Sequence, residues 1–400
     1  MSSRTELTFT PPVMEVGRWI DGKDFSKLPL INVSQAAPVA PPPRPLIEYM
    51  ANAIQEDSTH LYGPVLGLPE LRSEIAKQWS RAYGDTIKTT QVGITSGCNQ
   101  AFSASIAMLC GEGDEVILPT PFYFNHKMWL DMAGVSTVAL PCSGKMIPDP
   151  ALAASLITGR TRAIALVTPN NPCGVEYPPN VVMAFYQLAR KHRIALIIDE
   201  TYRDFHSALG MPHNLFQQNE WDETVVHLYS FSKAYRLTGH RVGALVTSEK
   251  RLGEVEKFLD TVSICPNQLG QKAALWGMQN LSEWLKGERL EILTRKQAII
   301  DGFEVLSDKG WQLLGVGAYF AYVQHPFSLA SNELCEKLVD DLAILTIPGT
   351  MFFPEGDETG KRQLRIAFAN ISTTEIKLLF SRLAVVSAVS YTHLTLPTTD

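Results

Sequence analysis

The feature that most constrains the fold is a regular alternation, between Gln91 and Val246, of short apolar runs with longer stretches of helical periodicity. Each run has the length of a buried strand and is followed by polar or small residues. This alternation predicts an α/β fold with a mostly parallel sheet and crossover helices in a large domain. Ligands of such sheets bind outside the carboxyl ends of the strands, so the residues after the runs are the first candidates for a site. The runs comprise residues 92–94, 116–118, 163–167, 194–198 and 225–228.

The last of these runs leads into a loop, Ser230 to Gly243, in which serines and glycines surround Lys233 and two arginines. Another apolar run, Ala244 to Val246, follows the loop. A lysine between two buried strands is desolvated, which lowers its pKa and favours the neutral amine. Schiff-base formation with a carbonyl cofactor requires a neutral amine. For the S-x-S-K segment alone, a surface loop with solvated basic side chains is the simpler interpretation.

Polar residues after three other runs have both a structural and a functional interpretation. Asp199 follows the run at 194–198, where a buried carboxylate is costly unless it is paired, although aspartate is also a good helix cap. Asn171 lies between two prolines, which is the usual setting of a turn residue. The small residues after the first run place backbone N–H groups at a helix N-terminus, either as a phosphate site or as a simple cap. They are Ser96, Gly97 and Cys98.

Two further residues lie in apolar surroundings. Arg365 is inside an alternating run, Leu364 to Phe368, so its side chain is expected to point inward or into a cleft. A buried arginine needs a carboxylate partner, and the residues alone suggest an Asp or Glu of this chain. Tyr123 follows the run at 116–118 and is equally explained as part of the core.

Together these segments resemble the class I/II aminotransferase family of fold-type I pyridoxal-phosphate enzymes, to which aspartate aminotransferases belong. The resemblance covers Leu30 to Val386, and its patterns occur in the order that the family shows. They are Y-x-x-x-x-G-x-x-x-L-R at 62–72, N-P-x-G at 171–174, D-E-x-Y at 199–202 and S-x-S-K-x-x-x-x-x-G-x-R-x-G at 230–243.

The resemblance implies that the cofactor is pyridoxal 5′-phosphate and that Lys233 forms its Schiff base. It implies that Asp199 pairs with the pyridine nitrogen, supported by His126, and that Asn171 and Tyr202 hydrogen-bond to the phenolate oxygen. Lys233, Asp199 and Tyr202 would then be the catalytic residues. The implied phosphate ligands are Ser230, Ser232 and Arg241, the turn at Ser96, Gly97 and Cys98, and Tyr62 from a neighbouring subunit.

For the remaining site the resemblance implies that Tyr123 stacks on the pyridine ring. Arg365 matches the residue that binds the substrate α-carboxylate bidentately. Ala36 lies in a substrate-facing backbone turn, and Asn171 also borders the substrate. This sequence departs from the common family pattern at two of these places, with Ala36 where glycine is usual and Cys173 where threonine is usual.

The implied activity is the transfer of an amino group from an L-amino acid to a 2-oxo acid, with Lys233 moving the α-proton. A C–S β-lyase or a decarboxylase on the same site stays open as an alternative, because a fold does not fix a reaction. A ligand-sensing regulator is a further alternative, although residues 1–45 are short and Pro-rich for a DNA-binding domain. No motif identifies the residue that reads the substrate side chain, but six aromatic residues suggest space for an apolar one: Phe122, Tyr123, Phe124, Phe320, Phe352 and Phe353.

The expected organisation has four parts. Residues 1–45 form an N-terminal arm and part of the small domain, and are either disordered or laid over their own small domain or a partner subunit. Residues 46–280 form the large cofactor-binding domain, and 281–386 a smaller α/β domain. Residues 387–400 lie beyond the last expected helix and resemble a translated vector remnant.

Composition sets limits on partners. A formal charge of −6 gives no electrostatic reason to expect nucleic acid or an anionic membrane as a partner. Six scattered cysteines without CxxC spacing predict reduced thiols rather than disulfides, and no metal site is expected. The N-terminus is polar and no apolar run reaches membrane-spanning length. We therefore expect a soluble cytoplasmic protein, and the family resemblance implies a homodimer with shared active sites.

Overall fold

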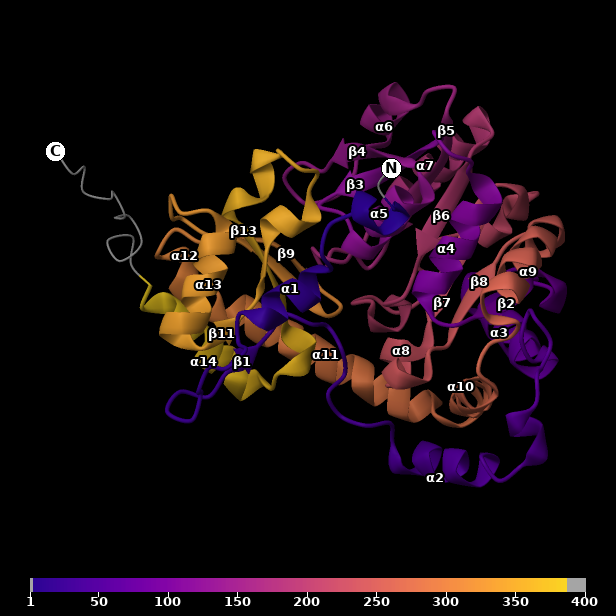
Figure 1. Ribbon diagram of the computed structural model, residues 1–400, viewed down its shortest axis with the longest axis horizontal. Coiled ribbons are helices and arrows are strands. Elements are labelled where there is room, and N and C mark those ends of the chain that lie inside the picture. The colour runs from indigo at the N-terminus through magenta and orange to yellow at the C-terminus, as the bar shows by residue number, and fades with distance from the viewer. Residues whose placement is uncertain (1–2, 387–400) are drawn as a thin grey trace.

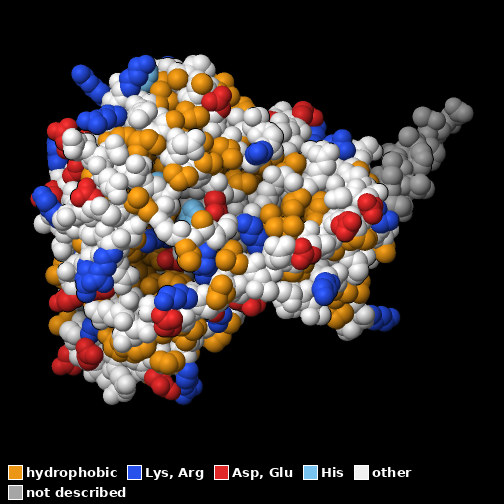
Figure 2. Space-filling view, turned by 180° about the vertical axis from the view of Figure 1, so that it is seen from behind, with side chains coloured by type: hydrophobic (Ala, Val, Ile, Leu, Met, Phe, Trp, Pro, Cys, Tyr) orange, Lys and Arg blue, Asp and Glu red, His pale blue; other side chains and the backbone are white. Residues whose placement is uncertain are grey.

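The computed structural model of the protein describes residues 3–386, so the expected non-native tail at 387–400 lies outside the described residues. Two lobes of unequal size are joined by a long helix, α11 (Ser282–Gly302), which runs from one lobe to the other (Figure 1). The larger lobe holds a seven-stranded sheet and the smaller lobe a four-stranded sheet. On the face shown in Figure 2, charged side chains of both signs are interspersed with hydrophobic ones.

The seven-stranded sheet has the strand order β2-β8-β7-β6-β5-β3-β4. Strand β8 is antiparallel to both of its neighbours, while the pairs from β7 to β4 are parallel. The predicted α/β class with a mostly parallel sheet is therefore confirmed. The strands are β2 (Val92–Thr95), β3 (Glu115–Thr120), β4 (Ser136–Pro141), β5 (Thr161–Val167), β6 (Ala195–Asp199), β7 (Val225–Ser230) and β8 (Gly243–Val246).

Helices cover both faces of this sheet, which explains why its central strands read as continuous apolar runs. In β6, Leu196 and Ile198 pack into one core, and Ala195 and Ile197 pack into another on the opposite face. The first core includes residues of α3 (Pro69–Tyr83), α7 (Pro179–His192) and α10 (Gln268–Asn280). The second includes residues of α4 (Cys98–Leu109), α5 (Phe124–Ala133) and α9 (Glu249–Ser263). Shorter helices of this lobe are α2 (Arg44–Ala53), α6 (Pro150–Leu156) and α8 (Phe231–Ala234).

Helix α3 shows how the sequence defines a helix at both ends. Pro69 occupies its first turn, where the missing N–H costs nothing. Leu71, Ile75 and Trp79 recur at helical spacing and are buried, as predicted. Gly84 ends the helix with a φ of 70°, a left-handed conformation that glycine adopts without strain.

The smaller lobe has an antiparallel sheet in the order β12-β13-β10-β9, whose core also contains residues of α11 and of two further helices. The apolar segment at 344–349 forms two short strands that belong to different sheets, because β11 pairs with β1 rather than with β13. The strands are β1 (Ile31–Asn32), β9 (Gln312–Gly317), β10 (Phe320–Gln324), β11 (Ile344–Leu345), β12 (Ile347–Pro348) and β13 (Gln363–Ala367); the helices are α13 (Ser331–Leu342) and α14 (Thr373–Ala384).

The described part of the N-terminal arm, from residue 3, contacts both lobes: Thr8 Oγ1 donates to Asp131 Oδ2 of α5 at 3.1 Å, and β1 pairs with β11 of the smaller lobe. Pro11 and Pro12 stand at the start of a helix, because proline is compatible with the first helical turn. In this helix, α1 (Pro12–Arg18), Val16 is buried against the smaller lobe. The arm then continues to β1, whose pairing with β11 is parallel. In Figure 1, α1 lies between the two lobes.

The helices after residue 247 are interrupted at two places. Ile264 has a φ of 60° and separates α9 from α10. Helix α11 ends at Gly302, and α12 (Glu304–Ser307) follows. Phe303 donates to the carbonyl of Ile300, three residues back, so the chain tightens at this junction. Among residues 3–386, no helix combines the length and apolar composition needed to cross a membrane.

Candidate active site

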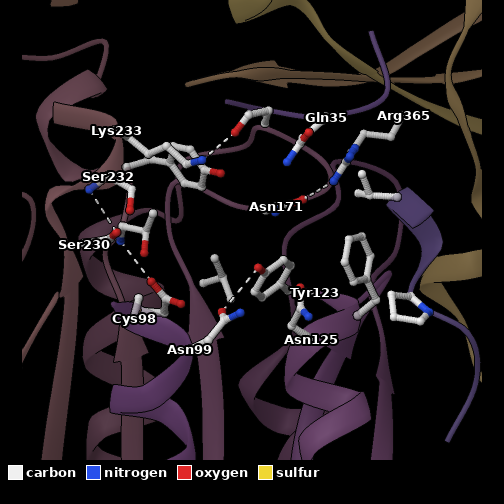
Figure 3. A pocket seen from close by; sticks show the side chains of 18 of the residues that line it. Gln35, Cys98, Asn99, Tyr123, Asn125, Asn171, Ser230, Ser232, Lys233 and Arg365 are labelled. Carbon is white, nitrogen blue, oxygen red and sulfur yellow. Dashed lines mark hydrogen bonds between the residues drawn. The ribbon is translucent and has the colours of Figure 1, made fainter. Parts of the chain in front are cut away.

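A cavity of about 380 Å³ opens at the carboxyl ends of the central strands, where the sequence predicted a ligand site. Strands β5, β6 and β7 deliver Asn171, Asp199 and Ser230 to its wall, and the short helix α8 delivers Lys233. Arg365, on β13 of the smaller lobe, closes another side (Figure 3). The cavity therefore brings together residues from distant parts of the chain, such as Arg365 and Asn171, which lie 194 positions apart.

Lys233 presents its amine to this cavity. Its Nζ donates a hydrogen bond to the backbone oxygen of Ala36, which belongs to the N-terminal arm. Burial lowers the pKa of Lys233 to about 8, and the positive charges of Arg241 and Arg365 act in the same direction. A substantial fraction of this lysine is therefore neutral near physiological pH, as the loop sequence predicted on physical grounds.

Asp199 is a buried carboxylate, 3% exposed, at the end of β6. Its Oδ2 lies 3.3 Å from Nε2 of His126, and the backbone N–H of Thr201 donates to its Oδ1 at 2.9 Å. Burial acts to raise the pKa of Asp199, but the hydrogen bonds and charge of His126 and the Thr201 contact outweigh it, so the pKa lies below its usual value. The carboxylate thus stays ionised inside the protein and faces the cavity.

Arg241 and two serines form an anion cradle. Arg241 Nη1 donates to Ser232 Oγ at 3.3 Å, and the Ser232 backbone N–H donates to Ser230 Oγ at 3.2 Å. A Cβ at Gly97 would collide with the Arg241 guanidinium, so only glycine permits this approach. Gly97 also precedes α4 with no side-chain cap, so this helix points uncapped N–H groups toward the cradle.

The turn at 96–98 contributes less than the sequence suggested. The Ser96 backbone N–H donates to Gln100 Oε1 at 2.6 Å, and the Gly97 N–H donates to the Thr95 carbonyl at 2.8 Å. Of the three predicted residues only Cys98 lines the cavity, so Ser96 is not brought into it. Burial and the negative charge of Asp199 raise the pKa of the Cys98 thiol well above its usual range, which keeps it neutral.

Arg365 is 2% exposed and has no carboxylate partner among the described residues, contrary to the simplest expectation for a buried arginine. Its Nη1 donates to Asn171 Oδ1 at 3.0 Å, its Nη2 donates to the Ser34 carbonyl, and its Nε has no hydrogen-bond partner. Burial lowers its pKa to about 10, which leaves it charged at neutral pH. A buried cation held only by neutral oxygens is suited to an anionic ligand.

Two tyrosines predicted for the site also line the cavity. Tyr123 donates from its hydroxyl to Asn99 Oδ1 at 3.4 Å, and its ring lies edge-on to His126 at 5.0 Å. Tyr202 is buried, and its ring meets Phe320 at 5.3 Å. Burial raises the pKa of both hydroxyls, so both are neutral donors.

Tyr62 is not brought into this cavity. Its side chain is 81% exposed, next to the exposed Leu61, and the Gly63 N–H contacts Cys265 Sγ at 3.4 Å. Val262 and Ile264 are also exposed and lie just before Cys265 in the chain. The contact between Gly63 and Cys265 therefore brings their segment close to Tyr62. One chain by itself therefore leaves Tyr62 on an exposed, partly apolar surface.

Sequence reasoning missed several lining residues. The arm contributes Pro11, Val13 and Met14, for which its Pro-rich sequence gave no signal. The other missed residues lie next to predicted ones, and their polarity was the only available signal; they are Gln35, Asn99, Asn125 and Thr201. Within the described chain there is no group of three or more His, Cys, Asp or Glu side chains suited to a metal ion.

Comparison with known proteins agrees with this fold. The family model described as aminotransferase class I and II matches residues 24–383. An aspartate aminotransferase of Thermotoga maritima is 28% identical over 337 residues, which cover 82% of this chain and 85% of the relative. A valine–pyruvate aminotransferase of Mycobacterium tuberculosis is 27% identical over 369 residues, covering 90% and 93%. A solved aminotransferase structure from the same organism superposes with a TM-score of 0.86 at 25% identity, covering 96% of this chain and 98% of that one.

The chain therefore belongs to the class I and II aminotransferase family. More particularly, it is a pyridoxal-phosphate-dependent aminotransferase, whose substrates are amino acids and 2-oxo acids.

The cavity also fits the cofactor by its chemistry. It offers an amine with a lowered pKa for the aldehyde, an ionised buried carboxylate for the ring nitrogen, and neutral hydroxyl donors. The cradle of Arg241, Ser230 and Ser232 beside an uncapped helix N-terminus suits a phosphate group.

Proposed function

We propose that the cavity around Lys233 is the active site in which an L-amino acid and a 2-oxo acid exchange an amino group. The observation that carries this proposal is the coexistence, in one cavity, of a lysine with a pKa of about 8 and a buried arginine without a carboxylate partner. The lysine supplies a neutral amine, and the arginine supplies a binding site for the carboxylate that every amino acid carries.

The proposal gives each cofactor-binding residue a task. Pyridoxal phosphate, when bound, supplies an electron sink for the charge that develops at the substrate α-carbon. Asp199 keeps the adjacent ring nitrogen protonated, and His126 holds that carboxylate in place. Arg241 and the serines bind the phosphate, and the turn residue Cys98 borders it. In this proposal Asn171 and Tyr202 hydrogen-bond to the phenolate oxygen, and Tyr123 stacks on the ring.

Substrate orientation rests on Arg365 and the arm. Two guanidinium nitrogens already point to oxygen atoms of Asn171 and Ser34, so a substrate carboxylate would replace or add to these contacts. The Ala36 carbonyl receives Lys233 in the structure, which places the arm backbone next to the reacting amine. Lys233, with a pKa near 8, can accept the α-proton as a base and return it as an acid.

A test compares Lys233→Ala with Lys257→Ala, a surface lysine that pairs with Glu254. Lys233→Ala should lose the cofactor absorbance of the lysine-bound form and the half-reaction with amino donors, whereas Lys257→Ala should retain both. A borohydride-reducible link between cofactor and protein in Lys233→Ala would show that another residue is the attachment site.

We also propose that the enzyme works as a homodimer with shared sites, in which Tyr62 reaches the partner's phosphate. Its 81% exposure beside other exposed apolar side chains supports this, because a closed two-fold interface would cover them reciprocally. Mixing Lys233→Ala with Tyr62→Ala should restore activity, since one site of each heterodimer then carries neither substitution. Verified heterodimers that stay as inactive as the parents would contradict the shared site.

The domain division is proposed at 46–280 and 281–386, with 1–45 as the arm. Separate hydrophobic cores in the two lobes and the pairing of β1 with β11 support it. A cytoplasmic location is proposed on the basis of six free cysteines, since reducing compartments maintain free thiols.

A further inference from the structure

One wall of the cavity is made of carboxamides and apolar groups. Asn99, at the start of α4, and Asn125, in the first turn of α5, lie near Tyr123 and apart from Lys233 and Arg365 (Figure 3). Both asparagines are at least partly accessible, so they border the open part of the cavity.

Helix α1 completes this wall from the other lobe. Val13 and Met14 line the cavity, and Val16, one turn after Val13, is buried. Met14 remains 60% exposed, so its flexible apolar side chain borders the cavity without being packed into a core. The wall thus combines hydrogen-bonding groups that carry no net charge with an adaptable apolar surface.

In the proposed function, each charged side chain that lines the cavity has a task or a partner that does not involve the substrate side chain. Among the described lining residues the cations are Lys233, Arg241 and Arg365, and the anion is Asp199. In the proposed function Arg241 faces the phosphate and Arg365 faces the α-carboxylate, while Lys233 acts through its neutral amine. A second substrate carboxylate would therefore meet carboxamides instead of a cation.

We propose that this enzyme selects amino acids with an uncharged side chain of about the size of methionine, leucine or glutamine, which Asn99, Asn125 and α1 contact. This inference rests on the proposed function of the same cavity. The Asn99 oxygen accepts from Tyr123, so its amide nitrogen is the group that can donate to a polar side-chain atom. Apolar substrate atoms lie against Val13 and Met14, where burial from water stabilises them.

The first test measures kcat/KM of the holoenzyme for methionine, leucine and glutamine against aspartate and glutamate, with pyruvate as acceptor. The uncharged donors should exceed the acidic ones by about a hundredfold or more, because an unpaired buried carboxylate is strongly disfavoured. A preference for aspartate or glutamate would overturn the inference and would indicate a cation contributed by a partner subunit, while leaving the aminotransferase function intact.

The second test introduces a positively charged side chain into the wall that carries Asn99 and Asn125. Asn99→Lys should raise kcat/KM for aspartate or glutamate by about tenfold or more and lower it for methionine, mainly through KM. Asn99→Gln is the matched control, since it keeps the carboxamide and should give no gain with acidic donors. If Asn99→Lys does not fold, Asn125→Lys provides the same comparison. An equal gain in lysine and glutamine variants, or no gain in a folded lysine variant, would contradict the assignment of this wall.

A binding measurement separates this inference from the proposed function. Calorimetry should show that 4-methylpentanoate, which has one carboxylate and an apolar end, binds at least about tenfold more tightly than succinate or glutarate. If no amino donor reacts but this order holds, the proposed function fails and the side-chain selectivity stands. If the dicarboxylates bind more tightly, the selectivity is wrong whatever the reaction.

Discussion

Two neighbouring carboxylates, Asp199 and Glu200, have opposite surroundings. Asp199 faces the cavity, contacts His126 and borders the reactive lysine. Glu200, the next residue, points into the core, where Tyr83 donates to its Oε2 and His227 Nε2 lies 2.8 Å from the same oxygen. Both are ionised despite burial. Burial acts to raise the pKa of each carboxylate, but hydrogen-bonding and histidine partners lower it by a larger amount.

The difference shows that burial and a shifted pKa do not by themselves mark a catalytic group. Successive side chains at the end of a strand point to opposite faces of the sheet, so one carboxylate reaches the ligand cavity and the other reaches packed aromatic rings. Glu200 lies among Tyr83, His213 and His227, and these rings also pack on Phe216. We therefore assign Asp199 to chemistry and Glu200 to stability.

The largest effect should come from Asp199→Ala. Removing a preorganised charge from the reacting centre typically lowers kcat by about 100- to 1000-fold, and we expect about 1000-fold here. Bound cofactor should stay detectable by absorbance, and the unfolding midpoint of the apoenzyme should change little by comparison. Near-normal turnover in a cofactor-loaded variant would show that Asp199 does not act in the reaction and that it does not differ from Glu200 in this respect.

Glu200→Gln should give the opposite pattern. Loss of a buried charge that tyrosine and histidine partners stabilise should lower the free energy of unfolding by about 3 kcal/mol, while kcat stays within about threefold. A lowered carboxyl pKa contributes stability above the unfolded value of 4.5 and loses it as pH falls through the folded value. The difference from the parent, measured by urea unfolding, should therefore shrink below about pH 4.5. A loss of kcat larger than that of Asp199→Ala would reverse the assignment.

Lys233 extends the comparison to a buried cation. Burial disfavours its charged form, so in the apoenzyme this lysine lowers the free energy of unfolding. In the apoenzyme the folded lysine releases its proton near pH 8 and the unfolded one near 10.5. Between these values the unfolded state binds more protons, so stability rises with pH through this window. Lys233→Met should accordingly stabilise the apoenzyme by about 3 kcal/mol at pH 7, with the gain vanishing near pH 10.5. A destabilised variant at pH 7 would mean that its contact with Ala36 outweighs desolvation.

The smallest effect is expected for His126→Phe, with His227→Phe as its counterpart beside Glu200. His126 stacks on Phe102 at 3.8 Å, so phenylalanine can occupy its place. Loss of its hydrogen bond should raise the pKa of Asp199 and lower kcat about tenfold, with the acid limb of the pH–rate profile moved upward. His227→Phe should change the unfolding free energy and leave that limb in place. Identical pH profiles for the two variants would contradict the distinction.

The sequence by itself determined the strands and the residues at their carboxyl ends. Continuous apolar runs alternating with helical stretches indicate buried strands of a mostly parallel sheet, and the polar residues after the parallel strands meet at one edge. Asn171, Asp199, Ser230 and Lys233 were accessible to this reasoning because each lies within a few residues of its strand. The family resemblance added Arg365 and Tyr202, whose surroundings are formed by distant segments.

Tertiary structure alone decided which side chains meet across long separations. The arm reaches Lys233 from 197 positions away, and Arg365 meets Asn171 across 194 positions, so no local pattern encodes either contact. The same holds for Glu200, which meets Tyr83 across 117 positions. Local propensity and periodicity act over one turn of helix or a few residues of strand, whereas these contacts depend on how separate elements pack. The sequence therefore determined the edge at which the site lies, and packing decided which walls surround it.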